Sequence, residues 1–388
     1  MRTPRVIAAA VVLTAMAAPA SAQRPQRLGD PIATFAEPFS NITGLRELSD
    51  GRVLLADQLE RHVSFIDFAS GDVQQIGREG QGPGEYATPS GLIPLPNDQS
   101  LLVDFGNMRL TRVEANGRLT DTWPMMRGDG TFIRPAGSDQ QGRLYFSTAG
   151  VMIMRRGGDG GVAEPSDSAA VQRWDPTTDV VDTVGMVKTP QTSVTTRPMS
   201  SGGMSFSGAM MQPFASADAW GVAPDGRVAI ARSAPYRLDW FHGSDATQGA
   251  PVDYQPIRIT QAEKEAWADR QAEQGATMRI RGTDGNRSQS FQMPRPNIDE
   301  IEFPEFKPPF EGRSIRITPW SEVWVERTTA HDATSIQYDV FDSQGRRVKQ
   351  IQLPEGRELV GFGREAVYVV RTDADDLQWL EKYEYRPQ

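Results

Sequence analysis

The feature that most constrains this 388-residue chain is a unit of two short apolar strands that recurs six times. Each unit runs through a tight polar turn, an apolar strand, a loop, a second strand and another tight turn. The first reads SDGRVLLADQLERHVSFIDFASGD (residues 49–72), and the fourth reads PDGRVAIARSAPYRLDWFHGSD (residues 224–245). Apolar residues at every second position, with Gly, Asp and Asn at the turns, are typical of antiparallel strands.

Two further strands flank the pair in most units. A first strand precedes it, as in ITGLREL, TFIRPAG and AWGVAP, and a fourth follows it, as in VQQIG, LTDTW and RVKQIQL. Four antiparallel strands per unit, repeated six times, predict an all-β fold, the six-bladed β-propeller. The alternative is six hairpins arranged in a sandwich or in two smaller sheets.

The two ends of the chain complement each other. The sixth unit ends at Tyr385 and lacks a fourth strand, whereas PIATFAE (residues 31–37) is a strand that no other unit needs. We therefore predict that this N-terminal strand closes the last blade, which removes two open sheet edges.

The N-terminal residues predict that the protein is exported. Residues 1–22 combine Arg2 and Arg5 with an apolar run and the small-residue sequence Ala20-Ser21-Ala22, the pattern of a secretory signal peptide. The apolar run is short for a membrane span, so we expect cleavage before Gln23 and no membrane span afterwards. We expect residues 23–388 to form a single domain. We also expect the mature protein to be a monomer that is either periplasmic or secreted.

The net charge bears on nucleic-acid binding, and the cysteine content bears on disulfide bonds. The chain has a formal charge of −9, and −11 once Arg2 and Arg5 are removed, so nucleic acid is a poor partner. It has no cysteine and therefore no disulfide.

A glycine-rich stretch, GREGQGPGEYATPSGL (residues 77–92), superficially resembles a phosphate-binding loop. A P-loop requires Gly-Lys-Ser/Thr at the start of a helix, and here Pro89, Pro94 and Pro96 follow instead. We expect the stretch to be a sharp turn that carries the chain from the first blade to the second.

This stretch and the strands after it resemble the NHL-type repeat of six-bladed propellers. Blade two carries the pattern at Gly80, Gly82, Gly84, Glu85, Tyr86, Pro89, Asp104, Asn107 and Arg109. Blade one keeps Asp57 but has His62 where blade two has Arg109, and blade four keeps Arg237. The resemblance is specific over residues 50–120 and implies the propeller fold.

Loop lengths differ between the two faces of the predicted propeller. The turns between first and second strands and between third and fourth strands define the bottom face, and they are short. The loops between second and third strands and the crossings between blades define the top face. The long insertions lie on this face, at residues 149–169, 186–215 and 259–310. Because long loops on a rigid scaffold commonly carry binding residues, we place the functional site on the top face.

Two insertions have local features of their own. Thr260 and Glu263 form a capping box for a helix over residues 261–275, which serves as a packing strut or as a moving lid. Met199, Met204, Met210 and Met211 could hold Cu(I) through their thioethers, but adaptable packing is the simpler reading.

Eight top-face residues are candidates for ligand binding because they fall at strand ends. They are Asp57, Asp104, Arg109, Arg134, Arg232, Arg313, Glu326 and Arg371. Carboxylates and guanidinium groups in one funnel can orient a carboxylate, a sugar or a peptide. The alternative is that they pair between blades and cap backbone groups, as NHL aspartates commonly do.

The function that these features favour is a non-catalytic, exported propeller that binds a small ligand or a protein partner, without a cofactor. The alternative is a metal-dependent lactonase-like hydrolase or lyase, with Asp57, Asp104 and Glu326 as metal ligands. A purely structural part of an envelope assembly is a third class. Catalysis has little support: the three histidines do not converge, and no G-x-S-x-G or H-E-x-x-H motif is present.

Overall fold

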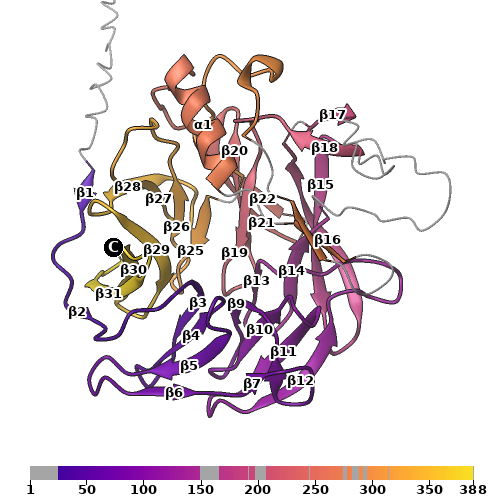
Figure 1. Cartoon of the computed structure of the whole chain (residues 1–388), viewed down its shortest axis with the longest axis vertical. Coiled ribbons are helices and arrows are strands. Elements are labelled where there is room, and N and C mark those ends of the chain that lie inside the picture. Colours follow the sequence, from indigo (N-terminus) through magenta and orange to yellow (C-terminus); the bar gives the residue numbers. More distant parts are fainter. Residues whose placement is uncertain are drawn as a thin grey trace, which may run out of the picture.

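The protein is a six-bladed β-propeller (Figure 1). The computed structural model describes residues 25–148, 166–190, 192–196, 207–243, 245–273, 278–281, 288–291, 295–312 and 314–387. Six sheets follow one another around a ring, and each is built from consecutive antiparallel strands, as the repeat predicts.

The strands of the first three blades have the following bounds. Blade 1 contains β3 (Ile42–Glu47), β4 (Val53–Asp57), β5 (His62–Ile66) and β6 (Val73–Gln75). Blade 2 contains β9 (Pro89–Pro94), β10 (Ser100–Asp104), β11 (Arg109–Val113) and β12 (Leu119–Pro124). Blade 3 contains β13 (Gly137–Ser138), β14 (Leu144–Ser147), β15 (Ser168–Asp175) and β16 (Val180–Lys188).

The other three blades repeat the same order. Blade 4 contains β19 (Ala219–Val222), β20 (Val228–Ser233), β21 (Tyr236–His242) and β22 (Asp245–Gln248). Blade 5 contains β25 (Ile315–Ile317), β26 (Val323–Glu326), β27 (Gln337–Phe341) and β28 (Arg347–Gln352). Blade 6 contains β29 (Arg357–Phe362), β30 (Ala366–Thr372) and β31 (Gln378–Glu384).

The N-terminal segment closes the ring, which confirms the prediction from the orphan strand. Its strand β2 (Ala33–Thr34) pairs antiparallel with β31, with Ala33 opposite Lys382, and so completes blade 6. Just before it, β1 (Gln26–Arg27) pairs parallel with β28 and adds a fifth strand to blade 5. The segment therefore bridges the last two blades.

The core is divided among the six interfaces between neighbouring blades. Each of six buried apolar clusters joins side chains from two adjacent blades. In β4, for example, Val53 and Leu55 pack toward blade 6, while Leu54 and Ala56 pack toward blade 2. Both faces of a second strand are thus buried, which explains why VLLA and SLLV read as continuous apolar runs.

The first strand of blade 3 is shorter than expected. The sequence predicts a strand within TFIRPAG, but β13 is confined to Gly137 and Ser138. Pro135 has no N–H to donate to a neighbouring strand, so regular pairing begins only beyond it.

The crossings between blades carry the remaining elements. The crossing from blade 1 to blade 2 holds β7 (Arg78–Glu79) and β8 (Glu85–Tyr86), which pair in parallel. Two antiparallel strand pairs also lie in crossings. One is β17 (Thr192–Thr196) with β18 (Ser207–Met211), and the other is β23 (Met278–Arg281) with β24 (Ser288–Phe291). Helix α1 (Gln261–Glu273) and the short 3₁₀ helix η1 (Ile298–Glu300) lie between blades 4 and 5 in the chain.

A buried ion pair attaches α1 to the propeller. Glu263 and Lys307, each 3% exposed, approach to 2.5 Å, and the backbone N–H of His331 in blade 5 donates to Glu263 at 2.9 Å. Burial raises the pKa of Glu263, but the bonds from Lys307 and His331 outweigh it and the net shift is downward. Glu263 N–H donates to Thr260 Oγ1 at 3.4 Å, so half of the predicted capping box forms, while the Glu263 carboxylate binds these partners instead.

Candidate ligand-binding site at the mouth of the propeller

Asp57 and Asp104 occupy equivalent positions at the top ends of β4 and β10. The two carboxylates are nearly or fully buried, at 2% and 0% exposed. Asp57 accepts hydrogen bonds from the backbone N–H groups of Ser40, Asn41, Leu59 and Glu60, at 2.7–3.1 Å. Each aspartate thereby holds the entry to the first strand of its own blade and the loop that follows its own strand.

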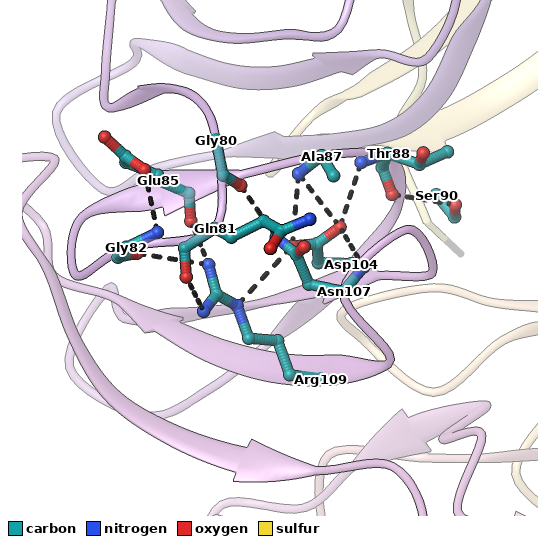
Figure 2. A network of polar contacts seen from close by, with 10 residues as sticks. All are labelled: Gly80, Gln81, Gly82, Glu85, Ala87, Thr88, Ser90, Asp104, Asn107 and Arg109. Carbon is teal, nitrogen blue, oxygen red and sulfur yellow. Dashed lines mark hydrogen bonds and ion pairs between the residues drawn. The ribbon is translucent and has the colours of Figure 1, made fainter. Parts of the chain in front are cut away.

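Asp104 repeats this pattern in blade 2, with an additional arginine (Figure 2). It accepts from the backbone N–H groups of Ala87 and Thr88 at 2.9–3.2 Å, and from the Asn107 side chain at 2.7 Å. Arg109 Nε lies 3.5 Å from Asp104 Oδ2. The serine and asparagine held by Asp57 and the alanine and threonine held by Asp104 stand at the same sequence distance from their aspartates, as expected for repeats.

Arg109 fastens the glycine-rich crossing from the other side. Its guanidinium donates to the backbone carbonyls of Gln81, Gly82 and Glu85 at 2.6–3.3 Å, as Figure 2 shows. Gly80 has φ +156°, a conformation that residues with side chains rarely adopt, and a Cβ there would displace the Glu85 carboxylate, which lies 2.1 Å from its position. The stretch is a tightly bonded turn, as predicted, and it fixes the direction in which the chain enters β9.

The segment that Asp104 fixes forms one wall of a cavity of about 530 Å³ on the top face. The described residues that line it come from three neighbouring blades: Thr43, Gln58, Thr88, Ser90, Phe105, Gly106 and Arg134. The size falls within the range of small-molecule sites. Gln58 and Phe105 directly follow Asp57 and Asp104, so the two buried aspartates lie immediately beneath the cavity wall.

Three polar side chains of this wall are held by hydrogen bonds to neighbouring groups. Thr43 Oγ1 donates to Pro89 O at 2.9 Å, and Ser90 Oγ donates to Thr88 O at 3.0 Å. The Gln58 amide donates to Ser90 Oγ at 3.1 Å. A cavity in which polar groups are already positioned requires little reordering when a ligand enters.

Arg134 is the predicted residue that lines the cavity itself. Its guanidinium is exposed and lies 5.4 Å from the centre of the Phe105 ring, on the approach to blade 3. The structure thus brings Arg134 together with the loops that Asp57 and Asp104 shape, and with the crossing that Arg109 fastens.

The remaining candidates lie in other blades. Arg232 pairs with Asp218 at 2.6 Å and Asp239 at 3.1 Å in blade 4, and Arg371 lies 3.6 Å from Glu381 in blade 6. Arg313 is outside the described residues. For these residues, and for Asp57, Asp104 and Arg109, ligand binding stays a prediction. Asp57 and Asp104 cap backbone N–H groups, as the alternative expects. The carboxylates that pair with Arg232 and Arg371, however, belong to their own blades and not to neighbouring ones.

Glu326 is half-buried and lies beside a tyrosine hydroxyl. Tyr338 donates to Glu326 Oε2 at 3.0 Å at the top of blade 5. Burial raises the pKa of Glu326 above its ordinary value, against the lowering effects of Tyr338 and Arg316. Burial likewise raises the pKa of Tyr338.

Two further observations concern metal binding and membrane-spanning helices. Over the described ranges, the His, Asp and Glu side chains form no group of three or more that could hold a metal ion. Within the same part of the chain, no helix is long and apolar enough to cross a membrane. The methionine cluster, Met199 to Met211, falls largely outside the described residues.

The sequence analysis missed most of the cavity. Gln58, Thr88 and Phe105 are ordinary loop residues without periodicity, and Ser90 is a polar residue at the start of β9. One signal could have found two of them: each stands next to an aspartate that the repeat pattern places at the top of a strand.

Comparison with known proteins gives similarity in fold. No protein-family model matches the chain, and no curated protein matches it. A gluconolactonase from Xanthomonas campestris is 12% identical, with a TM-score of 0.44, over 92% of this chain and 91% of that one. A protein of Bacteroides fragilis named as a putative exported protein is 13% identical, with a TM-score of 0.46. The similarity covers 90% of this chain and 91% of that one.

A third similar structure is the virginiamycin B lyase of Staphylococcus aureus. It is 12% identical, with a TM-score of 0.41, over 92% of this chain and 99% of that one. Similarity at this level concerns the fold alone and says nothing about what this chain binds or catalyses.

Proposed function

We propose that this protein is an exported, non-catalytic propeller that binds a small ligand in the top-face cavity. Residues 1–22 act as its signal peptide, and blades 1 and 2 are NHL-type repeats in which buried aspartates shape the binding loops. The observation that carries the proposal is the cavity of about 530 Å³, whose wall contains three side chains already fixed by hydrogen bonds.

The chemistry of the lining supports binding rather than bond cleavage. Its side chains are hydroxyls, one amide, one ring and one guanidinium. Hydroxyl and amide groups orient a ligand, and a guanidinium pairs with an anion. A general acid or base would have to come from elsewhere, because Asp57 and Asp104 beneath the wall have their oxygens engaged by backbone N–H groups.

The test is a ligand screen with a variant that fills the cavity. Ligand-observed NMR on the mature chain (residues 23–388) would examine sugars, organic acids and amino-acid derivatives. Ser90→Phe places a ring in the cavity, and Ser343→Phe, at an exposed turn on the bottom face, is the matched control.

We expect at least one compound class to bind the wild type and the control, and to lose its signal with Ser90→Phe. Gln58→Met, which removes an amide and keeps the side-chain length, provides a second variant in case Ser90→Phe does not fold. Failure of every class to bind, or binding that survives both cavity variants, would refute the proposal.

A further inference from the structure

Two hydroxyl oxygens of the cavity wall can accept hydrogen bonds from a ligand. The Thr43 hydroxyl donates to Pro89 O, and the Ser90 hydroxyl donates to Thr88 O. A hydroxyl oxygen has two lone pairs besides the hydrogen that it donates. Ser90 Oγ uses one of them to accept from the Gln58 amide at 3.1 Å. Thr43 Oγ1 and Ser90 Oγ therefore both keep a lone pair for a ligand.

The same wall also carries hydrogen-bond donors. The Thr88 hydroxyl has no hydrogen-bond partner among the described residues, so its hydrogen is available to a ligand. The Gln58 amide has two hydrogens and donates one of them to Ser90 Oγ. Gly106 leaves room beside the Thr88 hydroxyl, because a Cβ there would lie 2.6 Å from Thr88 Oγ1. A ligand that matches the wall must therefore both accept and donate.

The cavity does not require a charged ligand. A guanidinium can pair with an anion, but Arg134 already has partners within the protein, among them the Phe105 ring. The two acids next to the wall, Asp57 and Asp104, are buried and accept from backbone N–H groups. The hydrogen-bonding groups that remain for a ligand are the uncharged hydroxyls and amide described above.

An apolar ledge borders the cavity on the side of blades 2 and 3. We define it as Phe105, Met108, Met126 and Phe132. The rings of Phe105 and Phe132 are in contact, with their centres 6.1 Å apart, and Phe132 forms a backbone bridge with Met126. Met125 N–H donates to Met108 O at 2.9 Å. Phe105 belongs to both the ledge and the cavity lining, so the two surfaces are continuous.

The exposure of the ledge indicates that a ligand covers it. The described residues include nine large apolar side chains that are exposed, and three of them, Phe105, Met108 and Met126, belong to the ledge at 36%, 41% and 50%. A fourth, Leu59, adjoins Gln58 of the cavity. Met108 also has φ 51°, a left-handed conformation that is uncommon for a bulky residue. Exposed apolar side chains gathered beside a polar cavity mark a binding surface.

A peptide group has the hydrogen-bonding properties that the wall requires. It carries an N–H donor and a C=O acceptor with two lone pairs, it is planar, and it has no net charge. A sugar also offers donors and acceptors through its hydroxyls, but it has no large apolar group for the ledge. A peptide supplies one wherever an aromatic or large aliphatic side chain stands beside its backbone.

We propose that the ligand is a short uncharged peptide with a large apolar side chain, an identification that rests on the function proposed above. The C=O of one peptide group accepts from the Thr88 hydroxyl and the Gln58 amide. An N–H of the peptide donates to the Ser90 or Thr43 oxygen. The apolar side chain lies on the ledge, where methionine and phenylalanine adapt to aliphatic and aromatic shapes alike.

The probe is N-acetyl-L-phenylalanine N-methylamide, which is uncharged and contains two peptide groups. N-acetylglycine N-methylamide lacks the side chain, and the fully N-methylated probe lacks the N–H donors. N-acetyl-L-phenylalanine carries a carboxylate in place of the second amide. Titration calorimetry on the mature chain should show that the first two analogues bind about ten-fold more weakly than the probe, and that the acid binds no more tightly than the probe.

Two variants locate the contacts, each with a matched control. Thr88→Val keeps the shape of the side chain and removes a hydroxyl that the fold does not use, so it should weaken the probe about ten-fold. Thr122→Val, at an exposed position of β12, should not. Met126→Ser should weaken the probe and leave N-acetylglycine N-methylamide unchanged. Met186→Ser, at a position as exposed as Met126 but outside the ledge, should alter neither. Gln58→Met removes the other donor if Thr88→Val does not fold.

The outcomes separate this inference from the proposed function. If methyl glucoside or another non-peptide compound binds in a way that Ser90→Phe abolishes, and the probe does not bind, the cavity binds ligands but the ligand class is wrong. If the acid binds more tightly than the probe, or if either of the other analogues binds as tightly, the assignment of the peptide group and side chain is wrong. Unchanged binding to both Thr88→Val and Gln58→Met would refute the contact with the wall. If no compound binds at all, both proposals fail.

Discussion

The substitution Asp104→Ala tests the role that the structure gives to the buried aspartates. It removes the acceptor of two backbone N–H groups of the crossing, at Ala87 and Thr88, and of the Asn107 side chain. It also leaves the Arg109 guanidinium without its carboxylate at 3.5 Å.

The size of the effect follows from these contacts. A hydrogen bond to a charged group contributes about 1.5–3 kcal/mol, and a buried donor left without a partner costs a similar amount. Water entering from the adjoining cavity replaces part of the loss, so we expect Asp104→Ala to lower the free energy of unfolding by about 3–5 kcal/mol. Asp104→Asn keeps the shape and one acceptor oxygen, so its loss should be about 1–2 kcal/mol.

Urea unfolding followed by tryptophan fluorescence measures this directly. Asp121→Ala is the matched control in the same blade: Asp121 is exposed and pairs with Arg112 at 2.7 Å, so its loss should stay below about 1 kcal/mol. A loss below about 1 kcal/mol for Asp104→Ala, or one equal to that of the control, would refute the view that Asp104 holds the crossing in place.

Three further predictions concern other parts of the molecule. Lys307→Met leaves the buried Glu263 carboxylate without its partner and should cost about 3–5 kcal/mol in urea unfolding, and adding Glu263→Leu should recover most of it; no recovery would contradict the pairing. Burial raises the folded pKa of Glu326 above its ordinary value of 4.5, so stability present below pH 4.5 is lost as the pH rises through the folded pKa. The Tm of Glu326→Gln relative to wild type should therefore be higher at pH 7 than at pH 4, and the opposite order would show that the carboxylate is stabilised. Metal analysis of the mature chain before and after chelation should find no stoichiometric metal, whereas Ca²⁺, Zn²⁺ or Mn²⁺ retained through gel filtration would favour the lactonase-like alternative.

Much of the fold could be predicted because its signal is repeated. A pair of short apolar strands bounded by polar turns recurs in each blade, so an error in one unit is corrected by the others. The closing strand was predictable because the sixth unit lacks a fourth strand and residues 31–37 form a strand that belongs to no other unit. The short β13 was not, because Pro135 ends an apolar pattern that otherwise reads as a strand.

The site could be predicted only in part. The sequence places Asp57 and Asp104 at the tops of their strands, and the structure has them there. It leaves backbone capping open as an alternative but does not show which N–H groups are capped, because some of them lie 16 or 17 residues before each aspartate. The cavity escapes sequence reasoning because Thr43 and Arg134 belong to different blades and meet only when the ring is assembled.

The closure of the ring also sets the order of events during synthesis. Ala33 is among the first residues of the described chain to leave the ribosome, and its partner Lys382 is among the last. Contacts between such distant residues form slowly, because a long loop must close first. The ring therefore stays open until β31 has been synthesised, and Val53 and Leu55 of blade 1, which pack against blade 6, stay uncovered until then.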